Sequence, residues 1–196
     1  MRDGPTRVSQ LTPGGRGAIA TLLVSGEQTV SIVGGLFRSA SGIALADAPL
    51  GRILFGEWQH DPTRAGEELV VCRTDEHEIE VHCHGGRAAV EAIERSLVDA
   101  GCVSVSWQEI AHAQGDDPIA IAARIALAAA QTERTAAILL DQLHGALRTS
   151  LQRIAKDLHD SQADSAREQL VELQRYASVG QHLTDPFVVV LAGLPN

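Results

Sequence analysis

Residues 78–84 read EIEVHCH, a strict alternation of ionisable and apolar side chains. Because successive side chains of a strand point to opposite faces of a sheet, the ionisable groups share one face and the apolar groups the other. The first half of the chain must therefore contain a sheet with one buried face. The polar face could bind a metal ion through His82 and His84 or a cationic heterocycle through Glu80, or it could be a solvated surface.

The rest of the first half has a mixed α and β pattern. Apolar runs at residues 18–24, 53–58, 68–72 and 102–106 predict further strands. Ser25 and Gln28 form a potential capping box for a helix through about residue 37, and helical spacing predicts a second helix over residues 87–100, stopped by Gly101. We therefore expect an α+β N-terminal domain over residues 1–112, with a mixed sheet and flanking helices.

The second half has a helical pattern. Asp117 and Pro118 are typical of an N-cap and first turn, and the Ala-, Ile- and Leu-rich sequence that follows predicts one long helix that persists past Gly145. Ser165 and Glu168 form a second potential capping box, which predicts an antiparallel helix up to residue 180. We expect an α-helical domain over residues 113–185 and a new apolar strand at residues 187–191.

Composition limits the compartment and the partners. The chain has 25 acidic and 16 basic residues, a net charge of -9, and no basic cluster, so we expect it to bind nucleic acid poorly by itself. No apolar run approaches the ~20 residues of a membrane span, and the N-terminus does not resemble a secretory signal, which predicts a cytoplasmic protein without a membrane partner. The 3 cysteines, without a CxxC pair, predict reduced thiols.

Three glycine-containing segments could carry chemistry. Residues 12–17 read TPGGRG, in which Arg16 could hold a carboxylate or phosphate, although a plain entry loop has the same composition. Residues 84–86 read HGG before the helix over 87–100, whose free amides could hold an anion unless the glycines only form a turn. Residues 188–196 read VVVLAGLPN, the form of a strand that enters the motif G-x-x-x-x-G-K-[ST], or of a simple strand and turn.

These segments, in this order, resemble the TrmE (MnmE) family of tRNA-modifying GTPases. TPGGRGAIATLLVSG at residues 12–26 is similar to the family's TPPGRGGIAIIRVSG, and DEHEIEVHCHGG at residues 75–86 is similar to GEDVVEIQGHGG. QTERTAAILLDQLHG at residues 131–145 resembles SEQAARxALxxLxG, and GLPN matches the start of GxPNxGKS. The resemblance implies a folate-binding N-terminal domain that dimerises, a helical domain, and an inserted GTPase domain of which residues 186–196 form the first strand and the start of the phosphate-binding loop.

The resemblance also implies site residues and partners. Those implied for folate are Arg16, Gly17, Glu80, His84, Gly85 and Gly86, and those implied for the incomplete nucleotide loop are Gly193, Leu194, Pro195 and Asn196. It implies no catalytic residue and no metal ligand in this chain. The intact parent would use GTP, Mg and 5-formyl-tetrahydrofolate, form a homodimer, and act on tRNA with a flavoprotein partner.

Departures from the family pattern affect the folate site. SWQEIAHAQGDDPI at residues 106–119 keeps little of the family's PGEFTxRAFxNGKLDL, and His82 and Cys83 replace a glutamine and a glycine. We therefore expect 5-formyl-tetrahydrofolate to bind weakly or not at all, and GTP not to bind this chain alone. We interpret the chain as the N-terminal and helical portion of a TrmE-like GTPase. The alternatives are a dimerisation scaffold without catalysis and a stand-alone folate-dependent one-carbon transferase.

Overall fold

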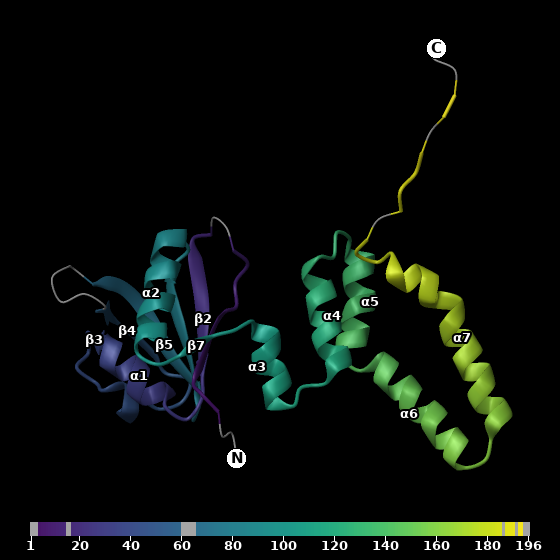
Figure 1. The fold of residues 1–196 in the computed structure, drawn as a ribbon, viewed down its shortest axis with the longest axis horizontal. Helices are drawn as coiled ribbons and strands as arrows, with labels where there is room; N and C mark the ends of the chain where they lie inside the picture. Colours follow the sequence, from purple (N-terminus) through teal and green to yellow (C-terminus); the bar gives the residue numbers. More distant parts are fainter. Residues whose placement is uncertain (1–3, 15–16, 60–65, 186, 191, 194–196) are drawn as a thin grey trace. The chain divides into compact units, whose positions relative to one another are not determined.

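The computed structural model describes residues 4–14, 17–59, 66–185, 187–190 and 192–193. The chain divides into two units, Met1–Gln114 and Gly115–Asn196 (Figure 1). The first unit combines a sheet with helices and the second contains helices, so the expected fold class is confirmed. None of the helices in the described ranges has the length and apolar character needed to cross a bilayer.

The first unit contains a seven-stranded mixed sheet in the order β3-β4-β5-β6-β2-β1-β7. Its strands are β1 (Arg7–Gln10), β2 (Ile19–Ser25), β3 (Phe37–Ser39), β4 (Ile53–Trp58), β5 (Glu67–Asp75), β6 (Glu78–His84) and β7 (Val103–Ser104). Neighbouring strands are antiparallel except β1 and β7, which are parallel. The five predicted strands of this half are present, whereas the short β1 and β3 were not predicted.

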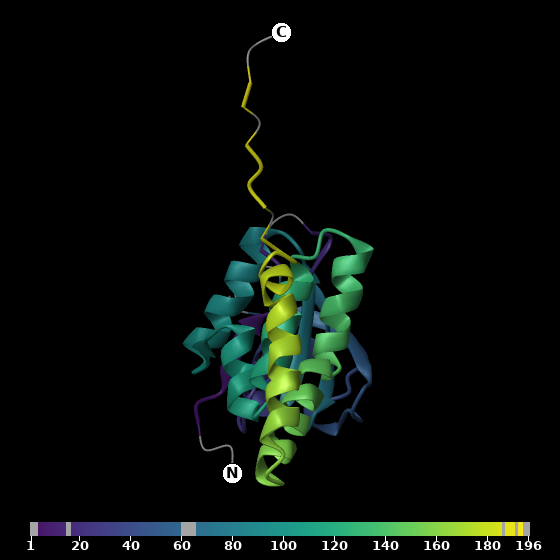
Figure 2. The same ribbon diagram turned by 90° about the vertical axis from the view of Figure 1, so that its right-hand side faces the viewer.

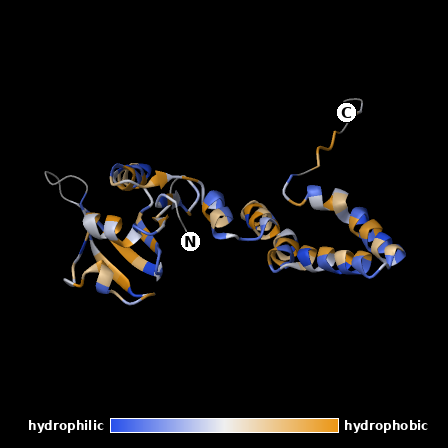
Figure 3. Cartoon of the chain, turned by 60° about the horizontal axis from the view of Figure 1, so that its bottom comes forward, coloured by the Kyte–Doolittle hydropathy of each residue, from blue (hydrophilic) through white to orange (hydrophobic). Residues whose placement is uncertain are grey.

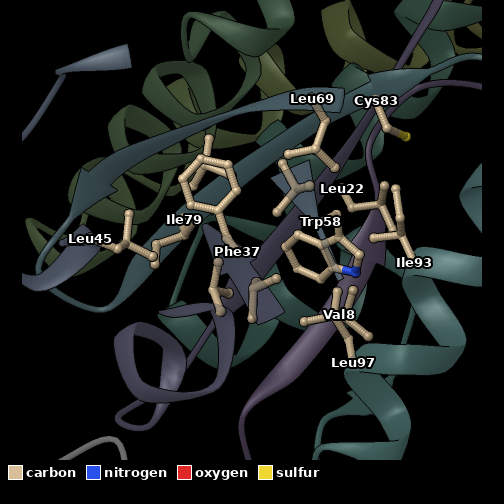
Figure 4. Close-up of a cluster of buried hydrophobic side chains, with 14 of the residues drawn as sticks. Val8, Leu22, Phe37, Leu45, Trp58, Leu69, Ile79, Cys83, Ile93 and Leu97 are labelled. Atoms are coloured by element: carbon tan, nitrogen blue, oxygen red, sulfur yellow. The ribbon is translucent and has the colours of Figure 1, made fainter. Parts of the chain in front are cut away.

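Helices α1 (Thr29–Leu36) and α2 (Arg87–Asp99) both pack against β6 and enclose the core. The Trp58 indole is fully buried there, near the labelled Val8, Ile93 and Leu97 (Figure 4). A short 3-10 helix (Leu45–Asp47) precedes β4, and α3 (Trp107–Gln114) packs against β1. The predicted helices of this half are confirmed, but α3 was not predicted.

The capping box predicted for α1 is wrong. The N-cap residue is Gln28, whose side chain makes no capping bond; its backbone N–H donates to Thr6 Oγ1 at 3.3 Å. The Thr29 hydroxyl donates to the Gly26 carbonyl at 2.8 Å. Gly26 has φ +145°, and a Cβ there would lie 2.7 Å from Thr6 Cα, so the chain requires glycine where it enters this helix. A contact with a residue 22 positions away thus replaces the local cap.

The second unit contains four helices in its described part: α4 (Pro118–Ala128), α5 (Glu133–Leu143), α6 (Ala146–His159) and α7 (Ala163–Gln181). The single long helix predicted after Pro118 is therefore wrong. Thr132 caps α5 by accepting a hydrogen bond from the Thr135 N–H at 3.1 Å, and Gly145 adopts φ +96° between α5 and α6. These two breaks divide an apolar sequence that contains no proline to end it.

Helix α7 runs back beside α6 (Figures 1 and 2), as the predicted antiparallel pair requires. The capping box predicted for its start is wrong, because α7 begins at Ala163 and its N-cap, Gln162, makes no side-chain bond. The Ser165 hydroxyl instead donates to Asp157 Oδ2 of α6 at 2.7 Å, and so joins the two helices. Polar and apolar residues alternate around these helices (Figure 3), as expected for helices with one packed side.

The strand predicted at residues 187–191 is not present in its described part. Residues 187–190 belong to no strand, and their side chains are 67% to 91% exposed. A strand needs a neighbour that completes its hydrogen bonds, and no strand of the described residues pairs with this segment. Leu191 lies outside the described residues.

Asp117 at the start of α4 predicts an acid-dependent loss of stability. Its carboxylate accepts the Ala120 N–H at 3.0 Å and lies 2.5 Å from Arg148 Nη2 of α6. The Arg148 hydrogen bond, with smaller contributions from the helix amides, lowers the pKa of Asp117 below its ordinary 3.8. Because the folded pKa is the lower one, this carboxylate stabilises the fold above pH 3.8, and the contribution is lost as the pH falls below that value.

We therefore expect Asp117→Asn to be less stable than the wild type at neutral pH and to lose less stability on acidification below pH 3.8. Urea unfolding followed by far-UV circular dichroism, repeated across this range, measures both effects. Asp116→Asn is the matched control, since that carboxylate lies 4.0 Å from Arg124 in a more exposed pair. If the free energy of unfolding of the wild type and of Asp117→Asn changed identically with pH, the lowered pKa of Asp117 would be contradicted.

Candidate functional site

The polar face of β6 lies at the centre of the sheet. Ile79, Val81 and Cys83 are buried in the core, while Glu80 and His82 are partly exposed on the other face, as the alternation predicts. In the register of the sheet, His82 lies opposite Thr21 of β2 and Val70 of β5. Glu80 lies opposite Leu23 and Cys72. Residues from three strands therefore surround these two ionisable groups.

Thr21, His82 and Glu80 form a row of contacting side chains that we call the polar cluster. His82 Nε2 lies 3.2 Å from Glu80 Oε2, and His82 Nδ1 lies 3.1 Å from Thr21 Oγ1. The Thr21 hydroxyl can donate to Nδ1 or accept from it, depending on the tautomer of the imidazole, and Nε2 lies within ion-pair distance of the carboxylate. The imidazole is thus held from both sides.

The polar cluster is connected to the first glycine-containing segment through Thr12. The Thr21 N–H donates to Thr12 Oγ1 at 3.2 Å, and the Leu11 N–H donates to the Thr21 carbonyl at 2.8 Å. The side chain of Gln10 also donates to Thr12 Oγ1, at 3.4 Å. The residues that open the TPGGRG segment therefore fix the position of Thr21, the partner of His82.

The two glycine-containing segments of this unit meet at Gly17 and Gly85. The Gly85 N–H donates to the Ala18 carbonyl at 3.0 Å, and a Cβ on Gly85 would lie 2.2 Å from the Gly17 carbonyl oxygen. Gly85 is therefore needed because another backbone passes directly over it. Gly86 serves a different purpose, as the N-cap of α2 with open space around it.

His84 is held apart from the polar cluster by Glu67 of β5. Glu67 Oε1 lies 3.1 Å from His84 Nδ1 and accepts the His84 backbone N–H at 3.2 Å. The His84 side chain is mostly exposed, whereas that of Glu67 is largely covered. Glu80 and His84 therefore lie on one strand but belong to two separate carboxylate–imidazole pairs.

A cavity of about 450 Å³ lies where Gly85 meets the first turns of α2. Its lining comprises Gln10, Gly14, Gly85, Arg87, Val90, Glu91 and Glu94. Arg87 Nε donates to Glu91 Oε1 at 2.7 Å, and this hydrogen bond lowers the pKa of the Glu91 carboxyl. Among the described lining residues, the paired guanidinium and the two carboxylates leave no excess positive charge for an anion, even though the end of a helix would favour one.

The three cysteines are free thiols. Burial, with a smaller effect of Glu67, raises the pKa of Cys83 to about 11, and burial raises the pKa of Cys102 to about 11. Burial and the neighbouring Glu80 also raise the pKa of Cys72. All three thiols are therefore protonated at neutral pH, which makes them poor nucleophiles. The described residues contain no group of three or more His, Cys, Asp and Glu side chains arranged to hold a metal ion.

The residues proposed from sequence fall into three groups. Gly17, Gly85 and Gly86 lie together at the junction of the two glycine-containing segments, and Glu80 and His84 lie on the adjacent strand. Gly193 is exposed. Four of the proposed residues lie outside the described residues: Arg16, Leu194, Pro195 and Asn196. The sequence analysis missed Thr21 and Glu67, which are brought to the site only by strand pairing.

Comparisons with known proteins extend the motif resemblance. No model of a protein family matches the sequence. The tRNA modification GTPase MnmE of Geobacillus kaustophilus is 28% identical over 235 aligned residues, which cover 100% of this chain and 51% of the relative. The MnmE of Bdellovibrio bacteriovorus is 27% identical over 232 residues, covering 100% and 48%, and that of Christiangramia forsetii is 33% identical over 115 residues, covering 56% and 24%.

The resemblance to the TrmE/MnmE family found in the motifs is confirmed by these matches. The chain spans about half the length of the first two relatives. The alignment with the Geobacillus protein has 235 positions for the 196 residues of this chain, so the relative contains segments that this chain lacks.

Proposed function

We propose that this chain is the N-terminal and helical portion of a TrmE-like GTPase that takes part in modification of the tRNA wobble uridine. The observation that carries this proposal is similarity over the whole chain to proteins named as tRNA modification GTPases. The contact between Gly17 and Gly85 supports it, because it brings together the two segments that carry the motif resemblance.

The same proposal covers domains, cofactors and partners. We assign residues 1–112 to the family-like N-terminal domain, 113–185 to the helical domain and 186–196 to the start of a GTPase domain. The intact protein would bind GTP and Mg, form a cytoplasmic homodimer, and work with a flavoprotein and tRNA. GTP hydrolysis belongs to the parent, so this chain by itself has no assigned catalytic residue.

A dimerisation scaffold without folate chemistry is the second candidate, and α3 favours it. The segment that has lost the family's PGEF-like pattern forms this helix, and its Ile110 and Ala111 are buried. Side chains that serve as core are not available to contact a ligand. Folate binding is therefore a separate part of the proposal. Its described residues are Gly17, Glu80, His84, Gly85 and Gly86, and Arg16 is its proposed cation.

Gain of function in a chimera tests the main proposal. This chain would replace the matching half of the Geobacillus kaustophilus MnmE, and the chimera would be expressed in a bacterium that lacks its own enzyme. We expect the modified wobble uridine to reappear in tRNA digests analysed by mass spectrometry. The unaltered Geobacillus protein is the positive control. A soluble chimera that hydrolyses GTP but leaves the uridine unmodified would contradict the proposal and favour the scaffold.

A further inference from the structure

The carboxylate of Glu80 already has an internal partner. Its Oε2 lies 3.2 Å from His82 Nε2, and the side chains of the two residues are 32% and 30% exposed. Residues i and i+2 of a strand point to the same face, so this pairing follows directly from the local sequence. Both groups are accessible enough to meet a ligand.

We propose that the His82 side chain pairs with the Glu80 carboxylate and thereby weakens the binding of ligands that present two adjacent N–H donors to this carboxylate. This inference rests on the proposed function, since it takes Glu80 as part of a surviving ligand pocket. The ligand class is a heterocycle with a cyclic amidine edge, in which a ring N–H and an exocyclic amino group point the same way. Such an edge binds a carboxylate best when both of its oxygens are available.

The second anchor of His82 makes its displacement costly. If only Glu80 held the imidazole, rotation about the side-chain bonds would free the carboxylate. Thr21 Oγ1 binds Nδ1 at 3.1 Å, and Thr21 is itself fixed by Thr12 and by pairing with β6. A ligand must therefore break the hydrogen bond to Thr21 and separate the imidazole from the Glu80 carboxylate, and the hydrogen bond alone contributes about 1 kcal/mol, a factor of about five in an equilibrium constant.

His84 provides an internal comparison. It also meets a carboxylate, Glu67, at 3.1 Å, but its side chain is 75% exposed and the same oxygen accepts the His84 backbone N–H. The His84 pair therefore ties a strand end together, whereas the His82 pair involves side chains alone. Only the His82 pair covers the carboxylate implied for ligand binding.

Calorimetry with 5-formyl-tetrahydrofolate tests the ligand claim on the full chain. We expect His82→Gln, which removes the imidazole held between Glu80 and Thr21 and restores the glutamine of the family-like motif, to bind at least about fivefold tighter than the wild type. The double variant His82→Gln/Glu80→Gln is expected to lose that gain. His112→Gln, on the exposed side of α3, is the matched control and should bind like the wild type.

Unchanged or weaker binding by His82→Gln would overturn the inference, as would a gain that survives the loss of Glu80. A second measurement does not depend on any ligand. Urea unfolding of the wild type, His82→Gln, Glu80→Gln and the double variant gives the coupling between the two side chains, and we expect a factor of about five in the unfolding constant.

Zero coupling would overturn the inference whatever the folate result. Coupling without folate binding in any variant would overturn the ligand claim while leaving the proposed function intact. The chimera experiment tests the proposed function separately, because it measures tRNA modification and does not depend on a variant of His82.

Discussion

The variant Gly85→Ala is expected to lower the free energy of unfolding of the first unit by about 3 kcal/mol or more. The added Cβ would lie 2.2 Å from the Gly17 carbonyl oxygen and 2.5 Å from its carbonyl carbon. Both are backbone atoms, so no side chain can rotate away to make room. The segment at Gly17 or the end of β6 must move, and the hydrogen bond from the Gly85 N–H to Ala18 would be strained or lost.

The adjacent glycine gives a matched control. Gly86 has φ -75°, an ordinary conformation for any residue, and a Cβ there would meet nothing within 4 Å. Gly86→Ala replaces a tolerated N-cap residue by a poorer one, so its expected cost is below about 1 kcal/mol. Urea unfolding monitored by circular dichroism compares the two variants. Equal stabilities would show that the backbone contact at Gly17 does not constrain the fold.

Removing the Trp58 side chain is expected to cost about 3 to 5 kcal/mol of folding stability. The indole is fully buried between the sheet and α2, and its Nε1–H donates to Ser96 Oγ at 2.9 Å. Ser96 in turn donates to the Ile93 carbonyl at 2.7 Å. Trp58→Ala therefore creates a cavity and removes one end of a buried hydrogen-bonded chain.

Phe55→Ala is the control for aromatic truncation on the same strand. Phe55 points to the other face and is 54% exposed, so its loss should cost about 1 kcal/mol or less. Ser96→Ala separates the two contributions at Trp58, since it leaves the indole in place with an unsatisfied donor, at a cost of about 1 to 3 kcal/mol. Denaturant midpoints measure all three. A Trp58→Ala variant as stable as Phe55→Ala would contradict the assigned core.

Sequence periodicity predicted the longer strands because their pattern is repeated. β6 spans seven residues, and every second side chain is buried, as its alternation requires. β1 and β3 span four and three residues, which is too short for a period of two to stand out, whereas the two residues of β7 were predicted only as part of the longer apolar run at residues 102–106. Their places in the sheet depend on pairing with β2 and β4, and a local pattern cannot express that dependence.

Helix ends were less predictable because competing partners come from elsewhere in the chain. Ser25 and Gln28 have the spacing of a capping box, but Thr6 binds the Gln28 N–H. Ser165 has the same kind of local signal and instead bonds Asp157 of the neighbouring helix. A capping pattern shows which hydrogen bonds a side chain could make, whereas tertiary contacts determine which of them it makes.

The candidate site was predicted in part for the same reason. Glu80, His84 and Gly85 stand in motifs that are continuous in sequence. Thr21 is separated from His82 by 61 positions, and Glu67 from His84 by 17, so neither carries a local sign of its role. Only the antiparallel register of β2, β6 and β5 makes them neighbours.

The pairing of β1 with β7 determines when the first unit can be completed during synthesis. Arg7 pairs with Val103 and Val8 with Ser104, so one edge of β1 has no neighbouring strand until β7 has been synthesised. At ribosomal rates, roughly 5 to 20 s separate the synthesis of these two strands. The second unit pairs helices that follow one another, α4 with α5 and α6 with α7, and such local contacts form soon after each helix emerges. A nascent chain therefore carries an open sheet edge at β1 until residue 104 has left the exit tunnel.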